Sequence, residues 1–294
     1  MPVETSTVET ADGRSLTVYG AGEPAGAALL VHHGTPASGL PYEAHVRLAE
    51  EQGIRLVSYD RPGYRESSRH SGRDVAAAAG DTGAIAAALG IDRFAVWGLS
   101  GGGPHALACA ALLPERVVAV ATVGGVAPYA AEGLDWLAGM GEANVQEFGA
   151  SLAGEERLRP ALEAEAAGLA VATTEELVTS MRTLLSEPDV AALEGELGTY
   201  LLATFQRALS RGVDGWVDDD LAFTRPWGFE PAEIGPPVLI VQGRQDFMVP
   251  GPHGDWLANR IPGAEASFSE DEGHLTLIQP RSVRRIHEWL LERL

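Results

Sequence analysis

The chain has 294 residues, of which 45% are hydrophobic and 21% charged, and this composition excludes a disordered protein. Its formal net charge of -20 argues against nucleic acid and anionic membranes as partners, because both require a basic surface. All 21 basic residues are arginines, which excludes lysine chemistry, and the single cysteine, Cys109, excludes an internal disulfide or a thiol-rich metal site.

The first fifteen residues lack a basic end followed by an apolar core, so we expect no signal peptide. The longest apolar run, residues 117–127, is too short to span a bilayer. We therefore expect a cytoplasmic protein whose partner is a small-molecule substrate, and no pattern indicates its oligomeric state.

In chain order, the first twenty residues alternate polar with β-branched or aromatic side chains around Asp12-Gly13, which predicts a hairpin. Apolar runs of strand length follow, and most are continuous, as is typical of parallel strands covered on both faces. These runs are residues 27–32, 54–59, 93–98, 117–123, 237–242 and 264–269.

Segments of helical length separate these runs at residues 41–52, 73–89, 101–113, 252–260 and 280–293. Strand and helix in alternation predict an α/β fold with a doubly wound, mostly parallel sheet of eight strands.

One interval, residues 128–230, has no convincing buried strand but several amphipathic stretches rich in Ala, Leu and Glu. Residues 128–236 carry 20 acidic and 6 basic residues, and thus 14 of the 20 net negative charges. We expect a helical cap insertion at 128–230 on a core formed by residues 1–127 and 231–294.

The core contains a candidate nucleophile in Gly98-Leu99-Ser100-Gly101-Gly102, which matches G-x-S-x-G. The match is short, but an apolar run precedes it and a helical segment follows, which is the strand-turn-helix setting that the motif requires. Glycines permit the strained turn and leave room beside the serine.

A serine needs a base, and of the eight histidines only His274 lies in a short glycine-containing loop between the last strand and the last helix. Asp246, directly after a strong apolar run, is the candidate acid. Other acids remain open, but Asp255, Asp271 and Glu272 are more typical of solvated positions.

An oxyanion hole is expected after the third strand, where His33-Gly34-Thr35-Pro36 forms a turn. The backbone N–H groups of Thr35 and Gly101 are the candidate donors.

Five motifs together resemble the α/β-hydrolase fold superfamily, in its capped serine branch, and they spread over residues 30–280. They are HHGTP, YDRPGYRESS, GLSGGGP with LLPERV, QGRQDFMVP, and EGHLTL. The resemblance implies Ser100 as nucleophile, Asp246 as acid, His274 as base and no cofactor or metal. Haloalkane dehalogenases and epoxide hydrolases share the HGxP turn but carry aspartate where this chain has Ser100.

Some relatives, such as proline iminopeptidases, carry a large residue directly after the nucleophile. This chain has Gly101 there, which we expect to leave the space beside Ser100 open. In the insertion, Tyr129, Trp216 and Trp227 are the candidate pocket residues. The run Asp218-Asp219-Asp220 is interpreted as a solvated surface or a helix cap, because consecutive carboxylates point in different directions.

We hypothesise a serine hydrolase that cleaves a small apolar ester, thioester or lactone through an acyl-enzyme. Two alternatives remain open: a carbon-carbon bond hydrolase on the same triad, and a ligand receptor on a retained hydrolase scaffold.

Overall fold

The computed structural model describes residues 2–294 and contains one sheet with the strand order β1-β2-β4-β3-β5-β6-β7-β8. β1 pairs with β2, and β2 with β4, in antiparallel fashion, and all other pairings are parallel. The predicted mostly parallel, eight-stranded sheet is confirmed. The strands are β1 (Glu4–Glu9), β2 (Ser15–Gly22), β3 (Ala27–His32), β4 (Ile54–Tyr59), β5 (Phe94–Leu99), β6 (Val117–Val123), β7 (Val238–Gly243) and β8 (Glu265–Ser269).

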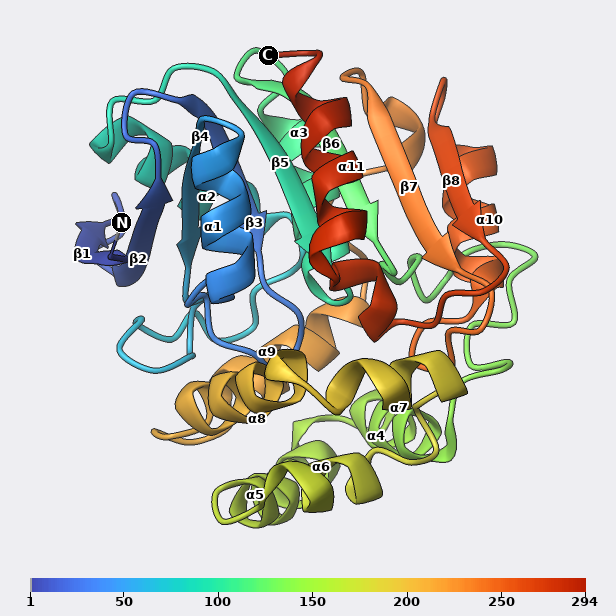
Figure 1. Cartoon of the computed structure of the whole chain (residues 1–294). Helices are drawn as coiled ribbons and strands as arrows, with labels where there is room; N and C mark the ends of the chain where they lie inside the picture. The colour runs from blue at the N-terminus through green and yellow to red at the C-terminus, as the bar shows by residue number, and fades with distance from the viewer. Residues whose placement is uncertain (1) are drawn as a thin grey trace.

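Two helical layers cover the sheet. Figure 1 shows α1 (Glu43–Glu51) and α11 (Pro280–Leu291) in front of the strands, with α2 (Ala77–Ala88) and α3 (Gly102–Leu112) behind them. Residues of α10 (Gly251–Arg260) belong to the same rear core as those of α2 and α3. The central strands are therefore buried on both faces, which explains their continuous apolar sequences.

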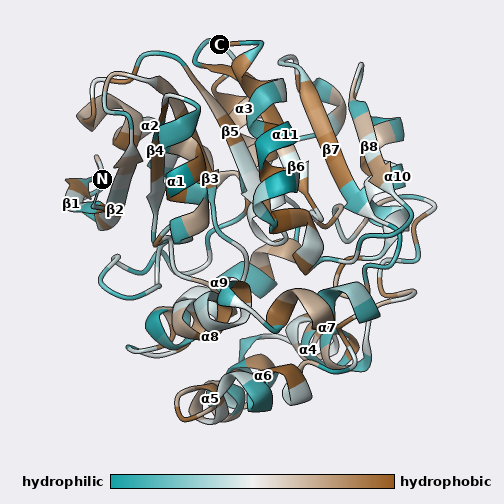
Figure 2. Ribbon diagram, in the orientation of Figure 1, coloured by the Kyte–Doolittle hydropathy of each residue, from teal (hydrophilic) through white to brown (hydrophobic). Residues whose placement is uncertain are grey.

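The packing follows from the residue pattern. Along α11, Val283, Ile286 and Leu290 are buried, and their spacing of three and four residues places them on one face of the helix. Figure 2 shows this helix alternating between hydrophobic and hydrophilic colours, whereas β7, buried along its whole length, is hydrophobic over most of it.

Six helices, α4–α9, lie between β6 and β7 in the chain, and we call them the cap helices. Figure 1 shows them gathered beyond the ends of β5–β8 at which the strand arrows point, so they cover the carboxyl edge of the sheet. Within residues 2–294, none of the helices has the length and apolarity that a membrane span requires. The cap helices are α4 (Glu142–Leu152), α5 (Glu155–Leu169), α6 (Thr174–Ser180), α7 (Glu187–Leu193), α8 (Glu196–Ala208) and α9 (Asp214–Phe223).

Candidate active site

Ser100 lies in the tight turn between β5 and α3 and has a φ of 52°, a region that L-residues with a side chain rarely adopt. Two hydrogen bonds hold this backbone: Ser100 N donates to Val123 O at 2.8 Å, and Gly103 N donates to Ser100 O at 2.8 Å. The turn therefore stores backbone strain at a serine that opens onto a cavity, as a nucleophile on a sharp strand-to-helix turn does.

The glycines of the motif are required by close backbone approach. A Cβ on Gly98 would collide with the carbonyl of Gly102, and a Cβ on Gly102 would collide with the carbonyl of His32. The interpretation of Gly101 as an opening is wrong: a Cβ there would collide with Thr35 Oγ1 and with the ring of Phe223 at 2.8 Å. Phe223 of α9 thus fills the space beside the nucleophile.

The candidate base and acid are in direct contact. His274 Nδ1 lies 2.6 Å from Asp246 Oδ2, and both side chains are buried. Burial disfavours a charged imidazole, but the facing carboxylate of Asp246 outweighs it, and the pKa of His274 is raised above its ordinary value. Because Nδ1 contacts this carboxylate, Nε2 is the ring nitrogen left to accept a proton.

Asp246 is fixed on its other side by the turn after β7. Its Oδ1 accepts hydrogen bonds from the backbone N–H groups of Met248 and Val249, both at 2.8 Å. Gln242 Nε2 donates to Oδ2 at 3.2 Å. These bonds leave the carboxylate one orientation, so the imidazole it faces is held in place as well.

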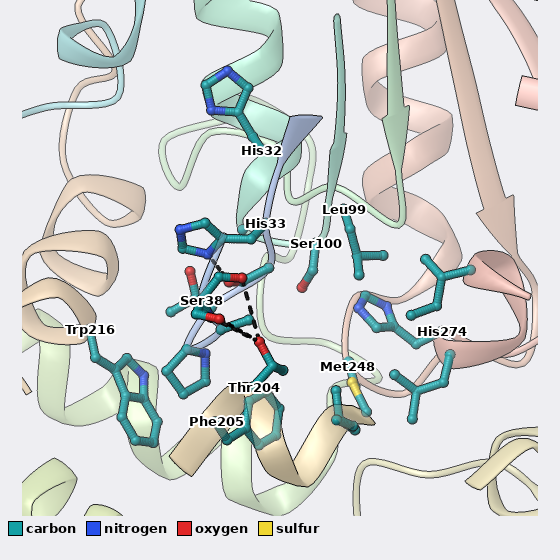
Figure 3. Close-up of a pocket in the computed structure, with 18 of the residues that line it drawn as sticks. His32, His33, Ser38, Leu99, Ser100, Thr204, Phe205, Trp216, Met248 and His274 are labelled. Carbon is teal, nitrogen blue, oxygen red and sulfur yellow. Dashed lines mark hydrogen bonds between the residues drawn. The ribbon is translucent and has the colours of Figure 1, made fainter. Parts of the chain in front are cut away.

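Ser100 and His274 line the same cavity, and Figure 3 shows both side chains reaching into it. Among the described residues, no hydrogen bond joins the Ser100 hydroxyl to the imidazole. Such bonds are often long in enzymes without substrate and shorten in the reacting complex.

A second carboxylate, which the sequence did not indicate, acts on the histidine loop. Asp189 of α7 is fully buried, and its Oδ2 accepts from His274 N at 3.0 Å. Its Oδ1 accepts from the N–H groups of Leu275 at 2.7 Å and Thr276 at 3.2 Å. The only signal in the sequence is the spacing in Ser186-Glu-Pro-Asp189, which is typical of a helix start.

The two candidate oxyanion donors lie on either side of Ser100. The backbone N–H groups of Thr35 and Gly101 donate no hydrogen bond to other described residues, so they are available to a ligand. Gly34 places its backbone close to Ser100: a Cβ on it would lie 3.6 Å from that of the serine. Two free N–H groups near a serine are what an oxyanion hole requires, so both residues remain candidates for that role.

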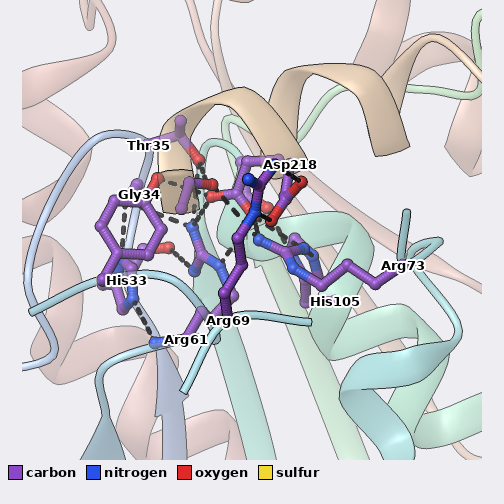
Figure 4. Close-up of polar contacts among 12 residues, drawn as sticks. His33, Gly34, Thr35, Arg61, Arg69, Arg73, His105 and Asp218 are labelled. Atoms are coloured by element: carbon purple, nitrogen blue, oxygen red, sulfur yellow. Dashed lines mark hydrogen bonds and ion pairs between the residues drawn. The ribbon is translucent and has the colours of Figure 1, made fainter. Parts of the chain in front are cut away.

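The turn that carries Thr35 is braced by charges from the cap. Asp219 of α9 is fully buried and lies 2.5 Å from Arg61 Nη2 and 2.5 Å from Arg73 Nη2. Figure 4 shows Arg61, Arg69 and Arg73 in this group of polar contacts. Asp219 also accepts from Thr35 Oγ1 at 2.7 Å, and Arg61 donates to the carbonyl of His33. Burial alone would raise the pKa of Asp219, but the two arginines hold it well below its ordinary value.

The interpretation of Asp218-Asp219-Asp220 as solvated is therefore wrong, because all three side chains are buried. Asp218 is paired with Arg69 at 2.9 Å, and Asp220 faces the cavity. Helical geometry still directs the three carboxylates differently, as expected, but each direction leads to a partner or a cavity inside the protein.

The cavity has a volume of about 180 Å³ and a mainly apolar wall. Figure 3 shows Phe205 and Trp216 on the cap side of the cavity, below Ser100 and His274 in this view. Trp216 lines the cavity, as predicted.

Tyr129 and Trp227, the other two predicted pocket residues, do not line this cavity. Tyr129 packs edge-on against Trp136, whose indole N–H is fixed to Ala127 O at 2.6 Å. Trp227 is buried in the rear core, where its ring lies 5.6 Å from that of Phe229. Both side chains pack against other aromatic rings outside the cavity, because large aromatic surfaces are most stable when covered.

Comparisons with known proteins agree with this architecture. Residues 27–280 match the model of the family described as alpha/beta hydrolase fold. No curated protein sequence is significantly similar to the chain.

Among solved structures, an esterase from Rhodococcus sp. ECU1013 is similar, with 23% identity, 99% of each chain covered and a TM-score of 0.72. A thermophilic esterase from Thermogutta terrifontis has 23% identity, 98% of each chain covered and a TM-score of 0.71. The enol-lactonase from Burkholderia xenovorans LB400 has 17% identity over 98% of this chain and 100% of its own, with a TM-score of 0.71. At these identities the similarity establishes the fold.

Proposed function

The chain belongs to the alpha/beta hydrolase fold family, and from this premise we propose that it is a serine hydrolase acting on a small ester, thioester or lactone through an acyl-enzyme. The observation that supports this most strongly is the buried pair of His274 and Asp246, 2.6 Å apart, at the same cavity as the strained Ser100. In this proposal residues 128–230 act as a cap on a core of residues 1–127 and 231–294.

In the first half of the reaction, Ser100 Oγ attacks the carbonyl carbon and its proton moves to His274 Nε2. The carbonyl oxygen becomes an oxyanion and accepts from the N–H groups of Thr35 and Gly101. Asp246 stabilises the imidazolium that forms. His274 then gives the proton to the leaving oxygen or sulfur as the bond from the acyl carbon breaks, which leaves the acyl group on Ser100.

In the second half, a water molecule takes the place of the leaving group. His274 Nε2 accepts a proton from the water as its oxygen attacks the acyl carbon, and the proton then returns to Ser100 Oγ. The products are a carboxylic acid and the regenerated enzyme. The largely apolar wall of the cavity favours substrates whose acyl part is a short hydrocarbon.

The test compares two serine-to-alanine variants on a chromogenic short-chain ester. Ser100→Ala should lower kcat/KM by about 10⁴-fold or more, because nucleophile and base act as a unit. Ser180→Ala, which changes a serine of the same cavity that has no histidine partner, should keep kcat/KM within about threefold of the wild type. Wild-type turnover in Ser100→Ala would contradict the mechanism.

A further inference from the structure

Three carboxylates that the hydrolytic mechanism does not use lie on the cap side of the cavity. They are Glu147 on α4, Glu165 on α5 and Asp220 on α9. These three helices pack against one another in each pairwise combination. Three separate segments of the chain thus direct an acidic side chain to one place, which a run of surface acids does not do.

Asp220 accepts no hydrogen bond from an N–H or hydroxyl group of any described residue, and the side chain within hydrogen-bonding contact of it is another acid, Glu147. The Asp220 side chain is 1% exposed. The charged group that acts on it most strongly is this same acid, Glu147. A buried pair of acids with no basic partner is costly in its charged form, and a cationic ligand would relieve this cost.

The rest of the cavity supplies no compensating charge. None of the described residues that line it is an arginine, and the chain contains no lysine. The neighbours Asp218 and Asp219 both have arginine partners, so arginines are available in this region but are absent from the Asp220 side of α9.

Burial raises the pKa of all three acids, and neighbouring acids add to this effect for Asp220 and Glu165. Burial, followed by the nearby acids, raises the pKa of Asp220 well above its ordinary value, and burial raises that of Glu147. Although part of the Glu165 side chain reaches solvent, its surroundings and Glu147 raise its pKa to about 7. A cation in the cavity would favour the charged form of each acid.

Aromatic rings complete this part of the wall. Trp216, Asp220 and Phe223 follow one another on α9 at spacings of four and three residues, so they share the face that lines the cavity. The indole N–H of Trp216 donates to Glu147 Oε1 at 2.9 Å, which orients that carboxylate. Acids beside aromatic faces are typical of sites for organic ammonium groups.

A metal ion is the weaker alternative. Within residues 2–294, no group of three His, Cys, Asp or Glu side chains is arranged to hold one. The apolar remainder of the wall also suits a carbon chain better than a hydrated ion.

We propose that Glu147, Glu165 and Asp220 form a subsite for a primary ammonium group, so that the preferred substrate is an ester or lactone whose acyl chain ends in an amine. The N–H donors of the ammonium group bind the carboxylate oxygens of Asp220, and the hydrocarbon part of the chain lies along the apolar wall. This inference rests on the proposed hydrolytic function for its first test and is independent of it for its second.

The first test uses nitrophenyl 6-aminohexanoate and nitrophenyl heptanoate, whose acyl chains differ only by an ammonium group in place of a terminal methyl. A longer pair, the 8-aminooctanoate and the nonanoate, covers a greater distance from Ser100. For at least one pair, kcat/KM of the amine should exceed that of the alkyl ester by about tenfold or more, which corresponds to about 1.4 kcal/mol.

Three variants then locate the preference. Glu147→Gln and Asp220→Asn should each reduce the ratio of the two kcat/KM values by about tenfold, and Glu165→Gln by less, because its side chain is partly solvated. Each ratio is taken within one variant, so a general loss of activity cancels. Glu163→Gln removes one exposed charge from α5, and its ratio should stay within about twofold of the wild type.

The outcomes separate the two proposals. If both esters are cleaved at equal rates, or if the ratio survives Glu147→Gln and Asp220→Asn, the ammonium subsite is wrong and the hydrolase stands. If no ester is cleaved, the hydrolytic function fails, and the subsite is tested by calorimetry with n-hexylamine and hexan-1-ol on the whole chain. Binding of the amine alone supports the subsite, and equal or absent binding overturns it.

Discussion

Asp219 and Asp220 are neighbours on α9 and are equally buried, but their surroundings are opposite. Asp219 lies against Arg61 and Arg73 and accepts a hydrogen bond from Thr35, whereas Asp220 accepts none from an N–H or hydroxyl group of the described residues and contacts another acid, Glu147. One side of the helix therefore attaches the cap helices to the oxyanion turn, and the other side closes the cavity.

A buried carboxylate therefore has no fixed role in this protein. Paired with arginines, it joins two segments that are 184 residues apart in the chain. Left without a cation, it holds its proton more tightly, and a cationic ligand would favour its charged form. The partners of each carboxyl, rather than its residue type or its burial, decide whether it supports the fold or is available to a ligand.

The largest loss of stability is expected from Asp219→Ala. Removing the acid leaves two arginines buried without their counter-charge, which should lower the free energy of unfolding by about 3–5 kcal/mol. Chemical denaturation at pH 7 measures this loss. Asp218→Ala is the matched control, because Arg69 keeps Asp214 and Glu155 as partners, and its loss should be under about 1 kcal/mol.

Asp189→Asn should have the next largest effect, on the base itself. Asp189 accepts three backbone N–H groups around His274, and its negative charge contributes to the raised pKa of the imidazole. An amide can accept only part of this set, so we expect a loss of about 1–3 kcal/mol in stability and a fall in kcat that exceeds any change in KM.

The pH profile of this variant shows whether Asp189 positions the histidine or only supports the fold. Because the base must be neutral, wild-type kcat/KM should rise with pH through a midpoint above the ordinary imidazole pKa of 6.5. Loss of the anion should move that midpoint to lower pH. Glu187→Gln, an exposed acid of the same helix, should leave it in place, and an unmoved midpoint in Asp189→Asn would refute the charge effect.

Asp220→Asn should have the smallest effect on stability, and of opposite sign to Asp219→Ala. The folded-state pKa of Asp220 is raised, so between its unfolded and folded values the native state binds more protons, and stability falls as pH rises. The new amide can donate to Glu147 and removes this dependence. We expect a gain of about 1 kcal/mol at pH 7 that shrinks toward pH 4, measured by thermal or chemical unfolding.

The three residues of the proposed triad could be selected from the sequence because each follows a strand. Ser100 lies in a glycine-rich turn, Asp246 comes after a strong apolar run, and His274 lies in the last loop, so short patterns locate them. The sheet follows from continuous apolar runs whose period and flanking turns are local properties.

The cap contacts could not be predicted in this way. Asp189 contacts His274 across 85 residues, and no local pattern links an acid of one helix to the backbone of a distant loop. Three consecutive aspartates suggested solvent because their arginine partners are far away in the chain. Tyr129 and Trp227 illustrate the same limit, since composition does not distinguish an aromatic ring in a cavity from one in a core.

Labelling with a fluorophosphonate probe tests the central claim most directly, because only an activated serine reacts. We expect one adduct per chain, located by peptide mass spectrometry at Ser100 and absent from His274→Ala, whose folded state is checked by circular dichroism. Wild-type protein that is folded but unlabelled, or labelled at a different serine, would contradict the account.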